Sequence, residues 1–315
     1  MALGTHSHTE DPRNQEILIW VNGELVPRAH AVVSVFDAGF ILGDGVWEGL
    51  RVHRGRPAFL GQHLDRLWEG ARAIMLDIGL SREEMSEAIT RTLAANDMTD
   101  GVHVRLMVTR GPKSTPYQDP RASAGPATVV IIAEHKAALP ETVERGITLF
   151  TTHVRRAHPD TLDPRINAHS KLNDIHACIQ AAHAGADEAL MLDPDGFVAT
   201  CNSTHFFIVV PGRGDGGRAE VRTSDGRYCL HGITRRAVLD VCAAAEIPAR
   251  ETTFSLTEVY SASEAFVTGT FAGVVPVTSV DGRTIGDGRR GPVVERLQQL
   301  YAEHITADVE GLGRS

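Results

Sequence analysis

The alternation of strand-like and helix-like segments in the second half of this 315-residue chain constrains its fold most strongly. Short apolar runs, such as EALML at 188–192 and HFFIVV at 205–210, have the length and composition of strands. Segments with helical periodicity separate and follow them, as in ITRRAVLDVCAAA at 233–245 and in the stretch after Gly291. This alternation predicts a domain that combines α-helices with a sheet.

The first half carries its own strand and helix signals. Two apolar runs flank Asn22-Gly23, which is a strong hairpin signal. Ser81, followed by Glu84 three residues later, predicts a capping box at the start of a helix. Two further strands are expected in GVHVRLMVTRG at 101–111 and PATVVIIAE at 126–134, around a loop rich in Gly, Pro and Ser. These signals predict a second, smaller α+β domain.

A polar connector, HKAALPETVERG, separates the two halves. We therefore expect two α+β domains with a site at their junction. The predicted segments are a loose N-terminus at 1–16, a smaller domain at 17–134, the connector at 135–146 and a larger domain at 147–315.

Composition excludes several classes of partner. The formal charge of −9 argues against nucleic-acid binding, which needs clustered basic residues. Apolar runs stay far below the roughly 20 residues that cross a bilayer, so we expect no membrane partner. The four cysteines (Cys178, Cys201, Cys229 and Cys242) are widely spaced, which is typical of reduced thiols in a cytoplasmic protein.

Histidines do not form a metal motif. His169, His176 and His183 recur every seven residues, whereas metal pairs on a helix are usually three or four residues apart. We interpret them as surface or packed side chains and expect no metal.

Lysine is scarce in this chain. Only three of the 31 basic residues are lysines, namely Lys113, Lys136 and Lys171. Lys171 stands where a polar turn enters a predicted helix, before the strands near 188 and 205. Any chemistry that needs a lysine amine therefore has few candidates, and Lys171 is the best placed.

Four motifs stand out along the chain, and three of them carry groups suited to an anionic ligand. GDGVWEGLR at 43–51 contains Trp47, and HLDRL at 63–67 contains Arg66, whose guanidinium matches a phosphate. LHGIT at 230–234 precedes an amphipathic helix, so its backbone N–H groups could bind an anion or simply cap the helix. FVTGTFAGVVPV at 266–277 is the fourth motif, with Gly269 allowing close backbone approach.

Together and in this order, the motifs resemble those of the class IV, or fold type IV, pyridoxal-phosphate aminotransferases. The resemblance implies a two-domain α+β fold, pyridoxal 5'-phosphate as cofactor, and amino-group transfer between an amino acid and a 2-oxo acid. Relatives are homodimers or larger. The residues that the resemblance assigns to the cofactor are Arg66, Thr200, Leu230, Gly232, Ile233, Thr234, Gly269 and Thr270. Those that it assigns to the substrate are Trp47, His103 and Arg105.

The chain departs from the family at the cofactor's reactive groups. Aligned without gaps on the family pattern K-x-x-N-x-L-N, Asn167 takes the lysine position and Lys171 falls four residues later. Thr200 takes the position of the glutamate that pairs with the pyridine nitrogen, where a hydroxyl could donate to an unprotonated nitrogen. A helix turn rises about 5.4 Å, so the arm of Lys171 could still reach the site and form the Schiff base. Lys136 and Lys113 are weaker candidates for that role.

Substrate class and reaction stay open. His103 stands where branched-chain aminotransferases usually have tyrosine, and the RxH pattern of D-amino-acid aminotransferases is missing from GPKSTPYQDP at 111–120. Two alternatives to transamination remain. One is a lyase of the aminodeoxychorismate lyase type, and the other is a non-catalytic protein that binds a phosphorylated ligand without a covalent link.

Overall fold

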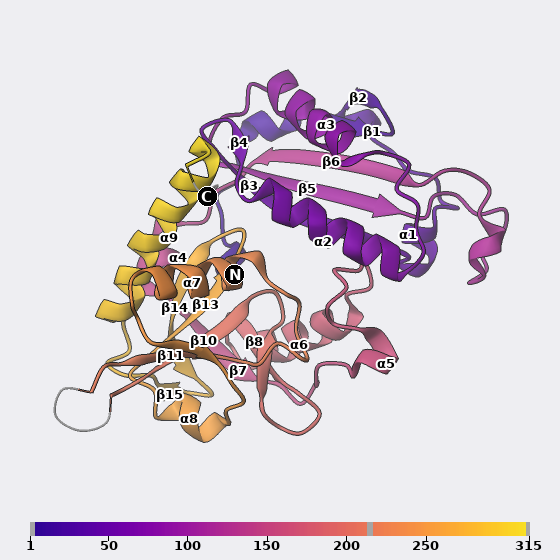
Figure 1. The fold of residues 1–315 in the computed structure, drawn as a ribbon. Coiled ribbons are helices and arrows are strands. Elements are labelled where there is room, and N and C mark those ends of the chain that lie inside the picture. The colour runs from indigo at the N-terminus through magenta and orange to yellow at the C-terminus, as the bar shows by residue number, and fades with distance from the viewer. Residues whose placement is uncertain (1–3, 213–216, 313–315) are drawn as a thin grey trace. The chain divides into compact units, whose positions relative to one another are not determined.

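Two β-sheets organise the part of the chain that the computed structural model describes, residues 4–212 and 217–312. Each sheet belongs to one of two structural units (Figure 1). The small unit comprises Thr9–Ala137, Ile166–Lys171 and the residues from Asp308 onward. The large unit comprises the residues up to His8, Ala138–Arg165 and Leu172–Ala307.

The small unit contains an antiparallel six-stranded sheet in the order β2-β1-β6-β5-β3-β4. Its strands are β1 (Leu18–Val21), β2 (Glu24–Pro27), β3 (Gly45–His53), β4 (Arg56–Pro57), β5 (Val102–Thr109) and β6 (Thr128–His135). Its α-helices are α1 (Ala38–Leu42), α2 (Leu60–Ala73) and α3 (Arg82–Ala95), and short 3-10 helices cover Pro12–Gln15, Arg28–His30 and Pro120–Ala122.

The two faces of this sheet differ in character. Side chains alternate along a strand, so Val46 and Leu50 point to the same face as Val104 of the neighbouring strand. That face packs against α2 and α3 and forms the core of the unit (Figure 1). The opposite face carries Trp47 and Arg105, which are only partly buried.

The large unit contains a mixed sheet in the order β12-β11-β10-β13-β14-β7-β8-β9, with β15 paired to β14. Its strands are β7 (Ile147–Thr151), β8 (Glu188–Leu192), β9 (Val198–Cys201), β10 (His205–Val210), β11 (Glu220–Thr223), β12 (Ala249–Glu251), β13 (Glu264–Gly269), β14 (Gly273–Val280) and β15 (Arg283–Thr284). Its helices are α4 (Pro140–Arg145), α5 (Pro159–Leu162), α6 (Leu172–His183), α7 (Ile233–Ala244), α8 (Leu256–Tyr260) and α9 (Pro292–Glu310), which extends past Ala307. The 3-10 helix η1 covers Gly4–His6.

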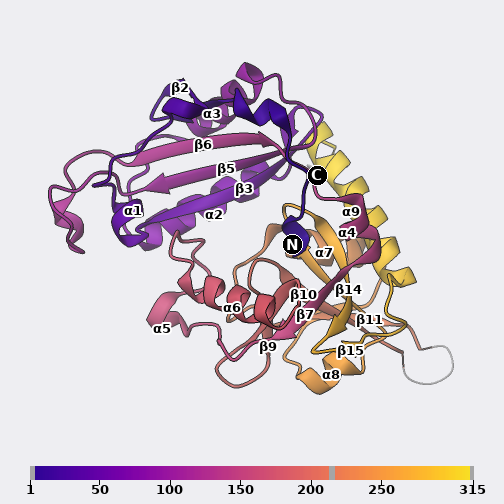
Figure 2. The ribbon, with the colours of Figure 1, turned by 180° about the vertical axis from the view of Figure 1, so that it is seen from behind.

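Helices pack on the sheet of this unit. α6 lies against β7 and β8, where its alanines Ala177 and Ala181 meet Ala189 and Met191 (Figure 2). Small side chains on both elements allow this close approach. α7 contacts β13, and α8 contributes Val259 to a second core on the sheet.

The structure confirms the α+β class and several local predictions. Asn22 and Gly23 both have positive φ and join β1 to β2, as the hairpin signal predicts. Ser81 and Glu84 form both hydrogen bonds of the capping box at α3. In the described residues, no helix is long and apolar enough to cross a bilayer.

The N-terminal segment makes specific contacts from Gly4 onward, and the Thr5 side chain is buried against the rest of the large unit. The sequence gives no sign of this contact, because the partner of Thr5 is Glu188, which lies 183 positions away.

Candidate active site

The segment 166–171 lies along β3 in the small unit. Ala168 forms an antiparallel bridge with Val46, and the Trp47 N–H donates to the Asn167 carbonyl at 3.0 Å. The His169 N–H donates to the Gly45 carbonyl, also at 3.0 Å. The segment that carries Asn167 and Lys171 is therefore anchored by backbone pairing.

Asn167, at the family's lysine position, is buried and tied to β3. Its Nδ2 donates to the Trp47 carbonyl at 2.7 Å, and its Oδ1 accepts from Nζ of Lys171 at 3.3 Å. Lys171 directly precedes α6 rather than lying in its first turn. The Lys171 amine thus reaches the side chain of residue 167, although its own backbone lies four residues further on.

The predicted substrate residues share one face of the small sheet. Trp47 stacks with the guanidinium of Arg105 at 3.7 Å, and Nζ of Lys171 lies 5.4 Å from the same ring. A Cβ at Gly49 would lie 3.1 Å from the His103 ring, so a larger residue there would press on that ring. Burial lowers the pKa of Arg105, which nonetheless stays far too basic to lose its charge. The structure therefore brings Trp47, His103, Arg105 and the Lys171 amine together.

Arg66 belongs to a buried ion-pair cluster. Its Nε and Nη2 donate to both oxygens of Glu48, at 2.8 and 2.7 Å. Nδ1 of His63 donates to the same carboxylate at 2.6 Å, and Glu48 and His63 are almost fully buried. Burial tends to raise the pKa of Glu48, but the charge of Arg66 and the hydrogen bonds from His63 and Arg66 outweigh it, so that this pKa is lowered.

This cluster predicts a loss of stability in mild acid. Burial lowers the pKa of His63 below 6.5, although its bond to Glu48 opposes the shift. Below pH 6.5 the unfolded chain therefore binds a proton at His63 that the folded chain excludes, and the free energy of unfolding falls as the pH falls. In His63→Asn, whose amide can still donate to Glu48, the free energy of unfolding measured in urea should fall less steeply as the pH drops below 6.5. An unchanged slope would show that His63 does not contribute.

In the large unit, Thr200 is buried at the end of β9. Its Oγ1 donates to the Thr204 carbonyl at 2.8 Å. The turn between β9 and β10 brings this carbonyl to the hydroxyl, so in this structure the hydroxyl hydrogen is engaged and a lone pair of Thr200 remains.

Three residues of the predicted anion site stand at the start of α7. Gly232 is the N-cap, and Ile233 and Thr234 follow in the first turn. The His205 ring packs on Gly232 so closely that a Cβ there would lie 2.2 Å from it, and its Nε2 donates to the Leu230 carbonyl at 2.6 Å. Backbone N–H groups at a helix start carry partial positive charge and favour anions.

The turn after β13 adds hydroxyls to the same unit. Gly269 and Thr270 connect β13 to β14, and Thr268 pairs across strands with His205. Thr268 is fully buried, and its Oγ1 has no hydrogen-bond partner among residues 4–212 and 217–312. A buried hydroxyl without a partner is costly, which fits a ligand acceptor at this position.

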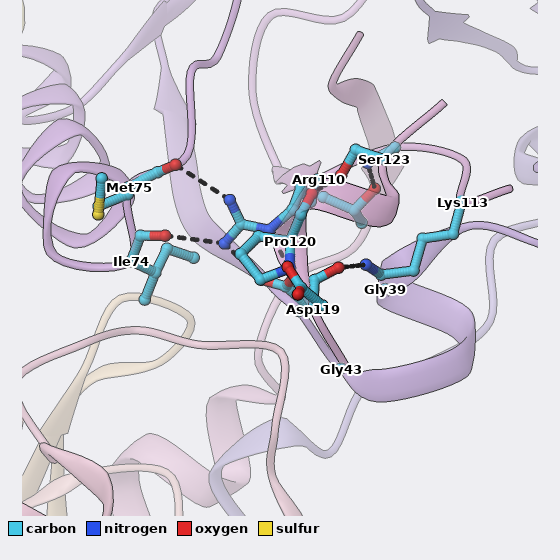
Figure 3. Close-up of polar contacts among 12 residues, drawn as sticks. Gly39, Gly43, Ile74, Met75, Arg110, Lys113, Asp119, Pro120 and Ser123 are labelled. Carbon is cyan, nitrogen blue, oxygen red and sulfur yellow. Dashed lines mark hydrogen bonds and ion pairs between the residues drawn. The ribbon is translucent and has the colours of Figure 1, made fainter. Parts of the chain in front are cut away.

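The other two lysines are placed differently. Lys113 is buried in the loop after β5, where its Nζ donates to the Asp119 carbonyl at 2.9 Å (Figure 3). In the same loop Arg110 donates to the carbonyls of Ile74 and Met75. Lys136 follows β6, and its carbonyl accepts from Arg51. These contacts give Lys113 a structural role in the loop.

Sequence reasoning missed several residues of these clusters. Glu48 and His63 stand inside the quoted motifs WEGLR and HLDRL, but only their neighbours were given roles. His205 stands five residues after Thr200, and Thr268 stands inside the motif FVTGTFAGVVPV at 266–277. The signal that could have found Glu48 and His63 is a charged and a titratable residue on the apolar faces of a strand and a helix.

Comparison with known proteins gives a consistent result. The sequence profile of the family described as Amino-transferase class IV matches residues 45–280. The branched-chain-amino-acid aminotransferase-like protein 2 of Arabidopsis thaliana is 42% identical over 92% of this chain, which covers 50% of that protein. The chain thus spans about half the length of the first curated relatives that it matches.

Other relatives match over nearly their whole length. The branched-chain-amino-acid aminotransferase of Pseudomonas aeruginosa is 35% identical over 93% of this chain and 94% of that protein. The crystal structure of a T.th. branched-chain amino acid aminotransferase with pyridoxamine 5'-phosphate superposes with a TM-score of 0.84. The two sequences are 30% identical, and the match covers 93% of this chain and 95% of that one. The chain therefore belongs to the class IV aminotransferase family and has its fold.

Proposed function

We propose that this chain is a pyridoxal-phosphate-dependent aminotransferase in which Lys171 supplies the amine that the family normally places four residues earlier. The observation that carries the proposal is the 3.3 Å contact between Nζ of Lys171 and Oδ1 of Asn167. Because Asn167 is itself fixed to β3, this contact delivers an amine to the position from which the family's lysine extends.

The phosphate of the cofactor would be held by the α7 start and the turn after β13. The residues that would contact the phosphate there are Leu230, Gly232, Ile233, Thr234, Gly269 and Thr270. Arg66 would add its guanidinium. Two observations in the described residues support the fit: the N-cap Gly232 has no side chain to cap the N–H groups behind it, and the Thr268 hydroxyl lacks a partner. A third is the ion pair with Glu48, which fixes the plane of Arg66. The missing glutamate is replaced by Thr200, whose lone pair can accept from a ring N–H.

Pyridoxal phosphate, when bound, supplies the electron sink for breaking the Cα–H bond of the substrate. The chain supplies the rest. Lys171 would hold the cofactor through its amine and would move the substrate proton as general base and acid. Arg105 binds the substrate carboxylate with its guanidinium, while Trp47 and His103 line the pocket around Gly49.

The substrate is proposed to be an amino acid with its matching 2-oxo acid. Branched-chain amino acids are the first donors to test, because the relatives above carry that name. Transfer requires an acceptor, so product should form from valine only when 2-oxoglutarate is present. Formation of more than one equivalent of 2-oxo acid per chain from valine alone would contradict the proposal, because the amino group would then have no acceptor. The four free thiols favour a reducing, cytoplasmic location.

We further propose that the chain works as a homodimer or larger homo-oligomer. The segment 32–42 of the small unit exposes six large apolar side chains, namely Val32, Val33, Val35, Phe36, Phe40 and Leu42. Monomeric proteins rarely expose so contiguous an apolar surface. A second copy of the chain is a suitable partner, because homo-oligomers with such apolar interfaces are common.

Substituting this segment should change the oligomeric state. Phe36→Ser with Phe40→Ser removes two of the largest exposed apolar groups and should shift the protein to monomer in analytical ultracentrifugation. Leu312→Ser, which removes an exposed apolar side chain from the C-terminal part of the small unit, serves as the matched control. A wild-type monomer, or an unchanged assembly in the double variant, would contradict this interface.

A further inference from the structure

The segment Gly4–His8, which we call the N-terminal strap, docks on the large unit at two points. At the first, the Thr5 N–H and Oγ1 donate to Oε1 of Glu188, at 2.9 and 2.5 Å. At the second, the His6 ring stacks on Phe271 with centroids 5.4 Å apart, and His8 meets the same ring edge-on at 6.4 Å. The Leu139 N–H donates to the Ser7 carbonyl and fixes the strap between these points.

Glu188 joins the strap to the turn between β9 and β10. Its Oε1 is held by Thr5, while its Oε2 accepts from Oγ1 of Thr204 at 2.8 Å and from Ser203 at 3.4 Å. The carboxylate is almost fully buried and makes no ion pair within the described chain. A buried carboxylate without a cation depends on its hydrogen-bond donors. Losing the two donors of Thr5 would therefore weaken the position of Glu188 and, with it, its hydrogen bonds to Ser203 and Thr204.

The turn between β9 and β10 in turn contacts the groups proposed to meet the cofactor. The Thr204 carbonyl accepts from Thr200, and the Thr204 methyl would lie 3.2 Å from a Cβ at Gly269. The other docking point, Phe271, directly follows Thr270. The strap is therefore connected to two turns. The Glu188 carboxylate connects it to the turn after β9, beside Thr200, and the Phe271 ring connects it to the turn after β13, beside Gly269 and Thr270.

Gly4 is fitted to this docking. It has φ of +56°, which favours glycine, and a Cβ there would lie 2.7 Å from Cγ of Glu188 and 3.0 Å from the Asp187 carbonyl. Close backbone approach at this point allows the next residue, Thr5, to place both donors on the carboxylate.

We infer that the N-terminal strap is a positioning element of the cofactor site, in which Thr5 and Glu188 hold the 202–204 turn and His6 holds the turn at 270–271. This inference rests on the proposed function for the identity of the ligand. The inference requires no movement of the strap during the reaction. Removing its contacts should loosen both turns and weaken cofactor binding while leaving the rest of the fold intact.

Two variants test the inference by hydrogen exchange, without any cofactor. Thr5→Val removes the hydroxyl donor, and Gly4→Ala displaces the strap without changing a hydrogen-bonding group. Each should speed amide exchange about 3- to 10-fold at 201–204 and 270–272, as expected for the net contribution of one typical hydrogen bond. Thr90→Val, the same change at an exposed site on α3, should leave these amides unchanged.

The second readout is affinity for pyridoxal phosphate, measured by quenching of tryptophan fluorescence. Both strap variants should bind the cofactor about 3- to 10-fold more weakly than the wild type and Thr90→Val. Faster exchange confined to residues 4–8, with unchanged affinity, would overturn the inference and make the strap a surface element. Wild-type protein that binds no cofactor would instead contradict the proposed function, and the exchange result would still decide whether the strap holds the turns.

Discussion

Lys171→Ala is expected to abolish covalent attachment of pyridoxal phosphate and to lower the rate of amino-group transfer by at least about 10²- to 10⁴-fold, the usual contribution of a general acid–base. The amine is held by Oδ1 of Asn167 and lies above Trp47, whereas the other two lysines follow β5 and β6. The measurement is the steady-state rate with valine and 2-oxoglutarate, together with the visible absorption of the bound cofactor.

Lys136→Ala is the matched control for this prediction. It removes a lysine amine from the same unit but from the end of β6, and it should keep both the absorption band and the activity. Retention of the band in Lys171→Ala would refute the assignment of Lys171. Loss of the band in Lys136→Ala alone would move the attachment to that residue.

Glu48→Ala is expected to destabilise the protein by about 3–5 kcal/mol, because it leaves Arg66 and His63 buried without their shared acceptor. Removing one member of a buried ion pair costs more than the pair contributes, since the remaining charge stays desolvated. Urea denaturation at neutral pH gives the free energy of unfolding. Glu48→Gln keeps an acceptor and should cost less.

Asp65→Ala provides the comparison, because it breaks an exposed ion pair with Arg82 close to the same helix. Exposed pairs contribute about 0–1 kcal/mol. If Glu48→Ala and Asp65→Ala lowered the free energy of unfolding by similar amounts, the ion-pair cluster of Glu48, His63 and Arg66 would not stabilise the fold as its burial indicates. Glu48→Ala should also weaken phosphate binding if Arg66 is oriented by this carboxylate.

Local sequence signals predicted the local structure well. The Asn22-Gly23 hairpin depends on positive φ at two adjacent residues, and the capping box depends on Ser81 and Glu84 three positions apart. The start of α7 behind Gly232 follows from similarly short-range chemistry. In each case the residues that specify the feature are neighbours in the chain.

Contacts between distant residues could not be predicted in this way. Asn167 lies 120 positions from the Trp47 carbonyl that fixes it, and Thr5 lies 183 positions from Glu188. The same limit holds for the Thr200 hydroxyl, since its acceptor, the Thr204 carbonyl, is set by the shape of the following turn. A motif match can place Lys171 near the right position, but only the folded segment brings its amine to Asn167.

The most direct test of the displaced lysine is to reduce the protein with borohydride in the presence of pyridoxal phosphate and to map the modified peptide. With three lysines in the chain, the site of attachment is unambiguous. We predict a single phosphopyridoxyl group on Lys171. Attachment at Lys136 or Lys113, or no covalent adduct despite binding of the cofactor, would contradict the account.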